Sequence, residues 1–361
     1  MDCQTARVAT ERAQRRGHER IAALTGHPAD PFALRFQIIE LLRPVVGFGR
    51  WCWPICDPGS GLGTTAVGDH DYWPALQRLL LLDQRPDEPN ALPTLAGASA
   101  RNPRAGGLRF LDVLGPAGIG DELRLPLRDR HGLWGCLDLM RSSDEEPFSE
   151  ADIRFLDRLA PALAAVTRRS AAAAAAAGIG ASPSPSAGVL VLDSDLDVRA
   201  STAAARAWLG QLLPPGLEFA DVAAMAVVYN VAGRALAGVG DSPARVRVRS
   251  ATGAWAIVEA DRLDPLEGTV AVTIRPAAAQ DVLDLRLLAY DLTAREREVV
   301  TALLDGSDTR AVSKRLFLSP HTVNDHLKAI FAKVGVRTRK ELTAMLAAPP
   351  REPAPEARPG A

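Results

Sequence analysis

Between Ser319 and Lys333 the sequence gathers side chains whose chemistry suits nucleic acid. An asparagine amide can form two hydrogen bonds with adenine, an aspartate can accept one from cytosine N4, and lysines bind phosphates. Apolar residues recur among them at helical spacing, so the polar residues are expected to share one face of a helix. The candidate DNA-binding residues in and before this stretch are Arg310, Lys314, Ser319, His321, Thr322, Asn324, Asp325, Lys328 and Lys333.

The elements that must position these residues are four short helices. Thr293, Asp308 and Ser319 are each placed to cap a helix, and Gly306 is placed to end the first one. A fourth helix is expected from Lys340. Two short helices joined by a tight turn, of which the second is longer and capped, form a helix-turn-helix, and the second helix can lie in a major groove about 12 Å wide.

Charge supports a polyanion partner in this region alone. The whole chain carries a net charge of −1. Residues 308–340 contain eight Lys or Arg and two Asp, which makes this window +6 and the remainder −7. Such asymmetry indicates a local patch that binds a polyanion. The sequence therefore predicts double-stranded DNA as a partner, and the alternative is a helical module that mainly dimerises.

Asp325 is unusual in a helix that reads DNA, because it brings a negative charge close to phosphates. It could accept a hydrogen bond from cytosine and exclude wrong sequences. Alternatively, it could form an ion pair within its own helix with Lys328, three residues further on. Both interpretations stay open at this stage. A homodimer is also predicted, through an apolar face of the fourth helix formed by Leu342, Met345 and Leu346.

Residues 292–346 resemble the LuxR-type, or FixJ-type, helix-turn-helix domain of bacterial transcription regulators. The resemblance lies in LTAREREV at 292–299 and SPHTVNDHLKAIFAKVGVRTRKEL at 319–342. It implies that Thr322 binds phosphate, that Val323 packs at the entry of the helix and that Asn324, Asp325 and Lys328 face the groove. Val323 therefore joins the DNA-binding set. The family usually has lysine at the position of Asn324 and rarely an acid at that of Asp325.

The rest of the chain alternates strand and helix patterns, which favours α+β domains. LRLPLRDRHGLWGCLDLMR with the helix pattern after it resembles a GAF sensor, and GVLVLDSDLDVRASTAAARAWL resembles a PAS sensor. Alternating arginines in RVRVRS indicate a solvated strand face. The fold class is therefore multidomain. We expect a GAF-like α+β domain at 1–169, an Ala/Ser/Pro linker at 170–187, a PAS-like α+β domain at 188–276, a connector at 277–289, an all-α four-helix helix-turn-helix domain at 290–348 and a disordered tail at 349–361.

Other function classes find little support in the sequence. The histidines have no spacing typical of catalysis, so we predict no enzyme, no catalytic residues, no cofactor and no metal. The four cysteines match no common zinc pattern and are expected to be small buried thiols. No segment predicts a membrane span or a secretion signal, which indicates a cytoplasmic protein. A small-molecule effector of the N-terminal domains is left open, since Trp51, Trp53, Trp73 and Trp134 could line a pocket, although core positions are expected for each.

Overall fold

A computed structural model describes residues 3–25, 31–69, 75–101, 107–176, 184–212, 220–238, 244–264 and 268–347. The chain divides into two compact units. The N-terminal unit contains residues 1–170 and 183–276, and the helical unit contains residues 171–182 and 277–361. Trp73, residues 177–183 of the predicted linker and the predicted tail lie outside the described residues, so the expectations for them are not addressed.

The first sheet of the N-terminal unit has five antiparallel strands in the order β2-β1-β5-β4-β3. Arg130 and His131 form the turn between the two longest strands, Gly132 begins the second of them, and Leu127 faces Gly135 across that hairpin. The strands are β1 (Arg50–Cys56), β2 (Gly63–Asp69), β3 (Ser99–Arg101), β4 (Ile119–Asp129) and β5 (Gly132–Ser142).

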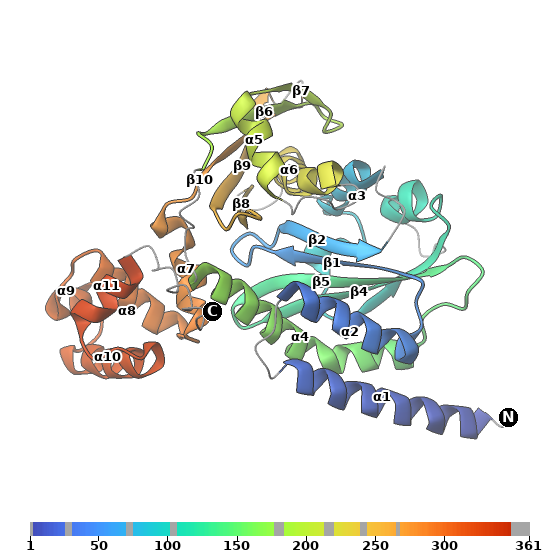
Figure 1. Ribbon diagram of the computed structural model, residues 1–361, viewed down its shortest axis with the longest axis horizontal. Coiled ribbons are helices and arrows are strands. Elements are labelled where there is room, and N and C mark those ends of the chain that lie inside the picture. The colour runs from blue at the N-terminus through green and yellow to red at the C-terminus, as the bar shows by residue number, and fades with distance from the viewer. Residues whose placement is uncertain are drawn as a thin grey trace, which may run out of the picture. The chain divides into compact units, whose positions relative to one another are not determined.

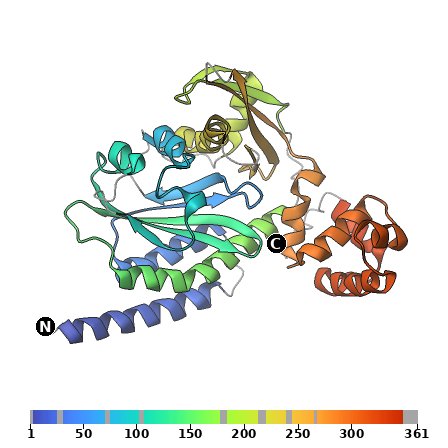
Figure 2. The same ribbon diagram turned by 180° about the vertical axis from the view of Figure 1, so that it is seen from behind.

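Helices cover both faces of this sheet. Figure 1 and the reverse view in Figure 2 show α2 and α4 against one face and α3 and α6 on the opposite side. Single-turn helices η2 (Leu92–Thr94) and η4 (Phe110–Leu114) lie in the connection between α3 and β4. The main helices of this region are α1 (Cys3–Thr25), α2 (Pro31–Val46), α3 (Leu76–Asp83) and α4 (Glu150–Ala176).

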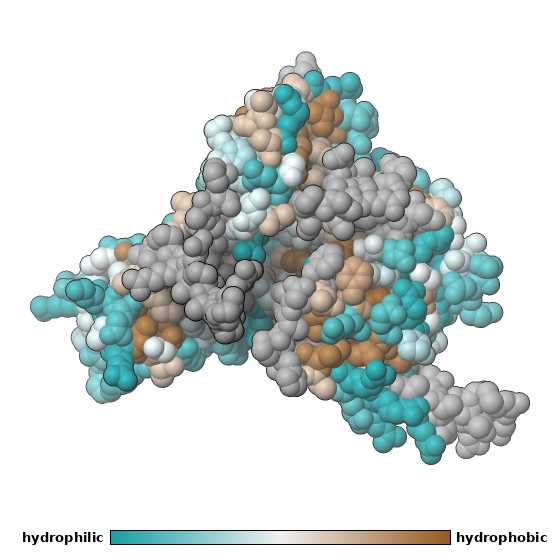
Figure 3. Space-filling view, in the orientation of Figure 1, coloured by the Kyte–Doolittle hydropathy of each residue, from teal (hydrophilic) through white to brown (hydrophobic). Residues whose placement is uncertain are grey.

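The core of this layer lies between the sheet and the pair α2 and α4. Strand alternation sends Trp51 and Trp53 into that core, where each is at most 2% exposed. Trp134 is also fully buried, so these three tryptophans are core residues. At the start of α4, Ser149 and Asp152 bond each other's backbone N–H groups in a capping box. Hydrophilic residues cover the coloured part of α1, and hydrophobic ones are exposed beside it, in the region of α2 (Figure 3).

A second five-stranded antiparallel sheet completes the N-terminal unit, in the order β7-β6-β10-β9-β8. Numbered within each sheet, both sheets have the same order, 2-1-5-4-3. Helix α6 was not predicted from the sequence, although the apolar stretch from Ala223 to Leu236 is longer than most strands. The elements are β6 (Gly188–Leu192), β7 (Val198–Ser201), α5 (Ala203–Leu212), α6 (Ala220–Ala237), β8 (Arg245–Arg249), β9 (Trp255–Asp264) and β10 (Thr269–Pro276).

The two sheets are joined through α6 and through the β1–β2 turn. Leu62 of that turn is buried in the core of the second sheet. Arg247 of β8 donates from Nε and from its backbone N–H to Asp57 Oδ2 at 2.8 and 2.7 Å, and from Nη2 to Oδ1 at 2.5 Å. The interpretation of RVRVRS as a solvated face is therefore wrong for Arg247, because the first sheet's turn covers it. Arg245 remains partly exposed beside Glu259.

The helical unit is all-α, as predicted. Leu283 and Leu287, which precede the predicted domain, pack into the same core as its own helices. Within the described part of the chain, none of the helices has the length and apolar content that a membrane crossing needs. The elements are η5 (Ala279–Val282), α7 (Leu283–Ala289), α8 (Ala294–Leu304), α9 (Thr309–Arg315), α10 (Pro320–Val334) and α11 (Arg339–Ala347).

Candidate nucleic-acid interface

The candidate reading helix is α10, and its ends are fixed by local chemistry. The Ser319 hydroxyl accepts a hydrogen bond from the Thr322 N–H at 3.0 Å, and Pro320 occupies the first helical position. At the other end Gly335 adopts φ +77°, a left-handed conformation that glycine adopts without a Cβ penalty. The predicted cap residues Thr293 and Asp308 also cap α8 and α9 through their side chains. Capping side chains therefore fix where each of the helices α8, α9 and α10 begins.

The faces of α10 divide as the periodicity predicts. Val323, Leu327, Ile330 and Val334 are buried in the helical core. Placing Val323 among the DNA-binding residues is wrong, because its side chain is 0% exposed and packs inside the domain. The opposite face presents polar side chains to solvent, namely His321, Asn324, Asp325 and Lys328. This face is the one available to a groove.

Asp325 is held between two side chains of its own helix. Its Oδ2 lies 2.9 Å from His321 Nδ1, one turn earlier. Its Oδ1 lies 3.4 Å from Lys328 Nζ. The intrahelical pair with Lys328 is thus present, and His321 is a second partner that the sequence analysis did not consider. Because all three groups are exposed, these contacts orient the carboxylate and add little stability.

The other predicted contacts are placed in three different ways. Arg310 and Lys314 are exposed on α9. Thr322 is half-buried, and its hydroxyl lies 2.9 Å from that of Ser319. Lys333 donates from Nζ to Glu296 Oε2 at 2.7 Å and is therefore tied to α8. Any phosphate contact by Lys333 would come in addition to this structural role.

The predicted dimer face on α11 is not an exposed apolar patch. Leu342 and Leu346 are 1% and 2% exposed and belong to the domain core. Arg286 of α7 donates to the carbonyl oxygens of Leu346 and Met345 at 2.8 and 2.9 Å, and so caps the end of α11. Only Met345 of the three is exposed, at 38%. Leu342 and Leu346 lie in the same core as Leu287 of α7, a helix that the four-helix prediction did not include.

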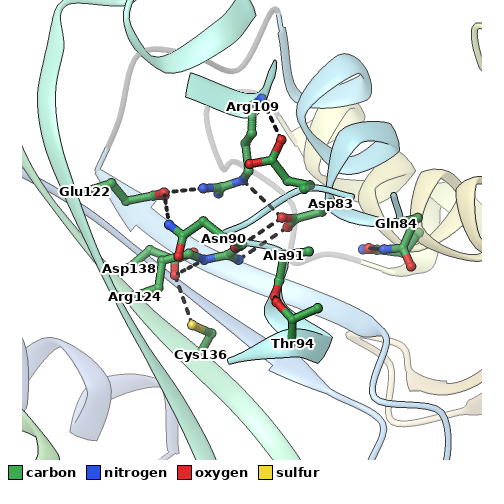
Figure 4. Close-up of polar contacts among 12 residues, drawn as sticks. Asp83, Gln84, Asn90, Ala91, Thr94, Arg109, Glu122, Arg124, Cys136 and Asp138 are labelled. Carbon is green, nitrogen blue, oxygen red and sulfur yellow. Dashed lines mark hydrogen bonds and ion pairs between the residues drawn. The ribbon is translucent and has the colours of Figure 1, made fainter. Parts of the chain in front are cut away.

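A second site of interest is a buried charge cluster on the first sheet, which the sequence analysis missed (Figure 4). Arg124 Nε donates to Asp138 at 3.0 Å, and its Nη1 donates to Asp83 at 2.8 Å. Arg109 lies beside Asp83 at 3.0 Å and donates to Glu122. The sequence does show charged residues at alternate positions of otherwise apolar strands, namely Glu122 and Arg124 on β4 and Asp138 on β5. It suggests a solvated face, but α3 and the chain after it cover these residues.

The ionisation of the cluster follows from burial and from its two guanidinium groups. Burial alone raises the pKa of Asp83, yet Arg124 and Arg109 bring it below its ordinary value. Burial is the largest influence on Glu122 and leaves its pKa raised despite Arg109. A buried pair is costly to break, because the remaining charge has no water to solvate it. The cluster therefore fixes α3 against the sheet.

Cys52, Cys56 and Cys136 are buried and unbridged, as expected for small buried thiols. Burial raises the pKa of Cys56 to about 12 and raises that of Cys52 further. Burial and the nearby Asp138 likewise raise the pKa of Cys136, whose thiol donates to that carboxylate at 3.0 Å. A thiol is nucleophilic only as thiolate, so these groups are unreactive at neutral pH.

A cavity of about 70 Å³ lies between the first sheet, α3 and α6. Cys52 and Leu79 contribute apolar walls, Arg124 and Asp138 lie at its sheet side, and Asn230 of α6 closes it. Gln84 Nε2 donates to Asn230 Oδ1 at 3.4 Å, which links α3 to α6 at this cavity. A polar and apolar lining of this kind is typical of a ligand site, although the volume suits only a few non-hydrogen atoms.

Comparison with known proteins identifies two domains. Residues 291–346 match the model for bacterial regulatory proteins of the luxR family, and residues 37–166 match the GAF domain. The spore germination protein GerE of Bacillus subtilis is 38% identical over 50 residues, which cover 14% of this chain and 68% of GerE. The probable transcriptional regulatory protein SgaR of Hyphomicrobium methylovorum is 36% identical over 107 residues, covering 28% of this chain and 50% of SgaR.

The chain therefore belongs to the luxR family of bacterial regulatory proteins, and it carries a GAF domain. A GAF domain structure of a putative sensor histidine kinase from Pseudomonas syringae pv. tomato aligns at 21% identity, with a TM-score of 0.30, over 45% of this chain and 88% of that one. The chain spans 6% of the length of a matching putative regulator of Mycobacterium bovis and half that of SgaR.

Proposed function

We propose that this protein is a bacterial transcriptional regulator that binds promoter DNA through α10. The observation that carries the proposal is the division of that helix into two faces. Its apolar stripe is buried, and its first turns present Asn324, Asp325 and Lys328 to solvent beside the basic residues of α9. Asn324 suits a base edge, whereas Lys328, Arg310 and Lys314 suit phosphates.

The N-terminal unit is proposed to modulate DNA binding in response to a small ligand or a partner. The GAF domain and the second sheet would act together, because α6 closes the cavity on the first sheet. The second sheet is proposed to be PAS-like, and its strand order, identical to that of the GAF sheet, supports this. A cavity of about 70 Å³ is about half the size of an engineered cavity that admits benzene, so a larger effector would displace α3 or α6. Such a displacement would favour one arrangement of the two sheets over another.

A homodimer remains part of the proposal, with Met345 as the exposed member of the predicted face. A module that only dimerises is less favoured, because dimerisation does not require the exposed cations of α9 and α10. An enzyme is also less favoured. The charged groups around the cavity are paired with one another, and the described thiols are held protonated.

The test is a binding selection with the full chain on duplexes that contain randomised positions. Sequencing the bound fraction should recover one enriched operator, and two similar half-sites at a fixed spacing would support the dimer. If successive rounds enrich no sequence above the unselected pool, sequence-selective DNA binding is refuted. A single enriched half-site would keep DNA binding and remove the homodimer.

A further inference from the structure

Phe317 is the residue of the helix-turn-helix that its fold alone does not explain. It lies in the turn between α9 and α10, two residues before the cap residue Ser319, and its side chain is 94% exposed. Its φ is +54°, in the left-handed region. A phenylalanine in that region is strained, and an exposed ring gains nothing from burial. The fold therefore bears two costs to present this ring to solvent.

The turn around Phe317 is held rigidly. Arg295 of α8 donates to the carbonyl oxygen of Leu316, on one side of the ring. On the other side, the Ser313 hydroxyl donates to the carbonyl oxygen of Leu318. Leu316 and Leu318 both pack partly against the helical core. Since its two neighbours are anchored inward and their carbonyl oxygens are hydrogen-bonded, the backbone that carries the ring is fixed before any partner binds.

The surroundings of the ring carry positive charge. Lys314 is exposed on the last turn of α9, and Arg310 is exposed one turn before it. On the other side, His321 is exposed at the start of α10. Phe317 lies two positions before the cap residue of α10, so the Cα atoms of the two residues are at most about 7 Å apart. An apolar ring between cations and the reading helix matches the edge of a DNA groove, where apolar groups lie among phosphates.

We propose that Phe317 packs against apolar groups of DNA at the margin of the site read by α10. This inference rests on the proposed function. Two groups offer that chemistry, the C5-methyl of thymine, which apolar side chains contact in the major groove, and the deoxyribose. Contact with the methyl would give Phe317 a preference for thymine. Contact with deoxyribose would give affinity alone.

The test uses the full chain and the operator enriched by the selection described above. Phe317→Ala should weaken binding roughly fivefold, the loss expected for about one buried methyl or methylene group. Phe317→Asn should weaken it as much while raising the thermal midpoint, because asparagine tolerates the left-handed conformation better. Leu263→Ala is the matched control, since Leu263 is an exposed apolar residue of β9, and it should leave binding unchanged.

Replacing thymine by deoxyuridine, one position at a time, distinguishes the two groups. Weaker binding by wild type, but not by Phe317→Ala, at one position would identify the thymine methyl. No effect at any position, with Phe317→Ala still weaker, would identify deoxyribose. Wild-type affinity in both Phe317 variants overturns the inference while leaving DNA binding intact. Unchanged affinity with lost promoter activity also overturns it, because the ring would then contact a protein. A wild-type chain that selects no DNA sequence refutes the proposed function itself.

Discussion

Glu296 of α8 and Lys333 of α10 are joined across the helical core by a 2.7 Å contact between Oε2 and Nζ. The same carboxylate oxygen accepts from the Thr293 N–H at 2.7 Å and thereby closes the capping box of α8. One buried acid thus connects the first helix of the domain to the reading helix. Lys333 therefore orients α10, whatever it contributes to phosphate binding.

Lys333→Met should destabilise the helical unit. The substitution leaves a nearly buried carboxylate with one bonded donor fewer, so the free energy of unfolding should fall by about 2 kcal/mol. Lys328→Met is the matched control, because the ammonium group of Lys328 is exposed and lies 3.4 Å from the carboxylate of Asp325, which is also exposed. It should change stability by less than about 0.5 kcal/mol. Denaturant unfolding measures both. Equal losses in the two variants would contradict a structural role for Lys333.

The same contact predicts a pH dependence. Burial alone would raise the pKa of Glu296. The hydrogen bonds from Lys333 and Thr293 together outweigh this effect and bring the pKa below its ordinary value. A carboxyl group with a lowered folded-state pKa stabilises the fold above its unfolded pKa, near 4.5, and loses this contribution as the pH falls through the folded value. Stability should therefore decrease below about pH 5. The decrease should be shallower in Glu296→Gln, and an identical slope in that variant would count against the assignment.

The helix-turn-helix could be predicted from sequence because its signals are local. The caps at Thr293, Asp308 and Ser319 and the apolar stripe of α10 each depend on residues within a few positions. The errors came from long-range packing. Leu342 was expected at a surface because nothing in its own helix reveals that it is buried in the core of the domain. Likewise, Arg247 resembles a solvated arginine until Asp57, 190 positions earlier, is brought beside it.

Asn324→Ala should reduce affinity for the selected operator and relax one base position. The loss expected for one bidentate base contact is about 1–3 kcal/mol. Asn324 is exposed and lies outside the domain core, so the variant should keep the wild-type unfolding midpoint. Repeating the selection with the variant gives the base preferences. Reduced affinity with an unchanged preference at every position would mean that Asn324 contacts only the backbone.

Asp325→Ala should leave the best operator bound at least as tightly as in wild type, while poorer sites become acceptable. His321 and Lys328 hold the carboxylate in place. In the proposed complex it would lie near phosphates and would oppose binding wherever no cytosine N4 donor meets it. The measurement is the affinity ratio between the selected operator and single-base variants. A ratio that does not fall after the substitution would show that Asp325 does not contribute to base selectivity.

Arg247→Ala should weaken the junction between the two sheets of the N-terminal unit. Loss of the guanidinium leaves Asp57, 4% exposed at its side chain, without its charged partner, which costs about 3 kcal/mol. Arg245→Ala, on the same strand but beside Glu259 at 3.9 Å, should cost far less. In a double-mutant cycle with Asp57→Ala, the second substitution should add little. Fully additive losses would mean that the two residues do not act as a pair.

Leu342→Ala should destabilise the helical unit by about 2–5 kcal/mol, as expected when a buried leucine is truncated. Met345→Ala should cost less than about 1 kcal/mol, because this side chain is partly exposed. If the dimer uses this helix, Met345→Lys should reduce cooperative binding to two half-sites while the domain stays folded. Sedimentation at matched concentrations measures association. Similar destabilisation by both alanine variants would contradict the placement of Leu342 in the core.

The most direct test of DNA reading by α10 is the affinity of the full chain for its selected operator and for a scrambled duplex of equal length, across a series of salt concentrations. Sequence-selective binding predicts an operator affinity at least about 10³-fold higher than that for the scrambled duplex. It also predicts that the logarithm of both affinities falls linearly with that of salt concentration, because phosphate contacts release counterions. Equal affinity for the two duplexes at every salt concentration would contradict the proposed function.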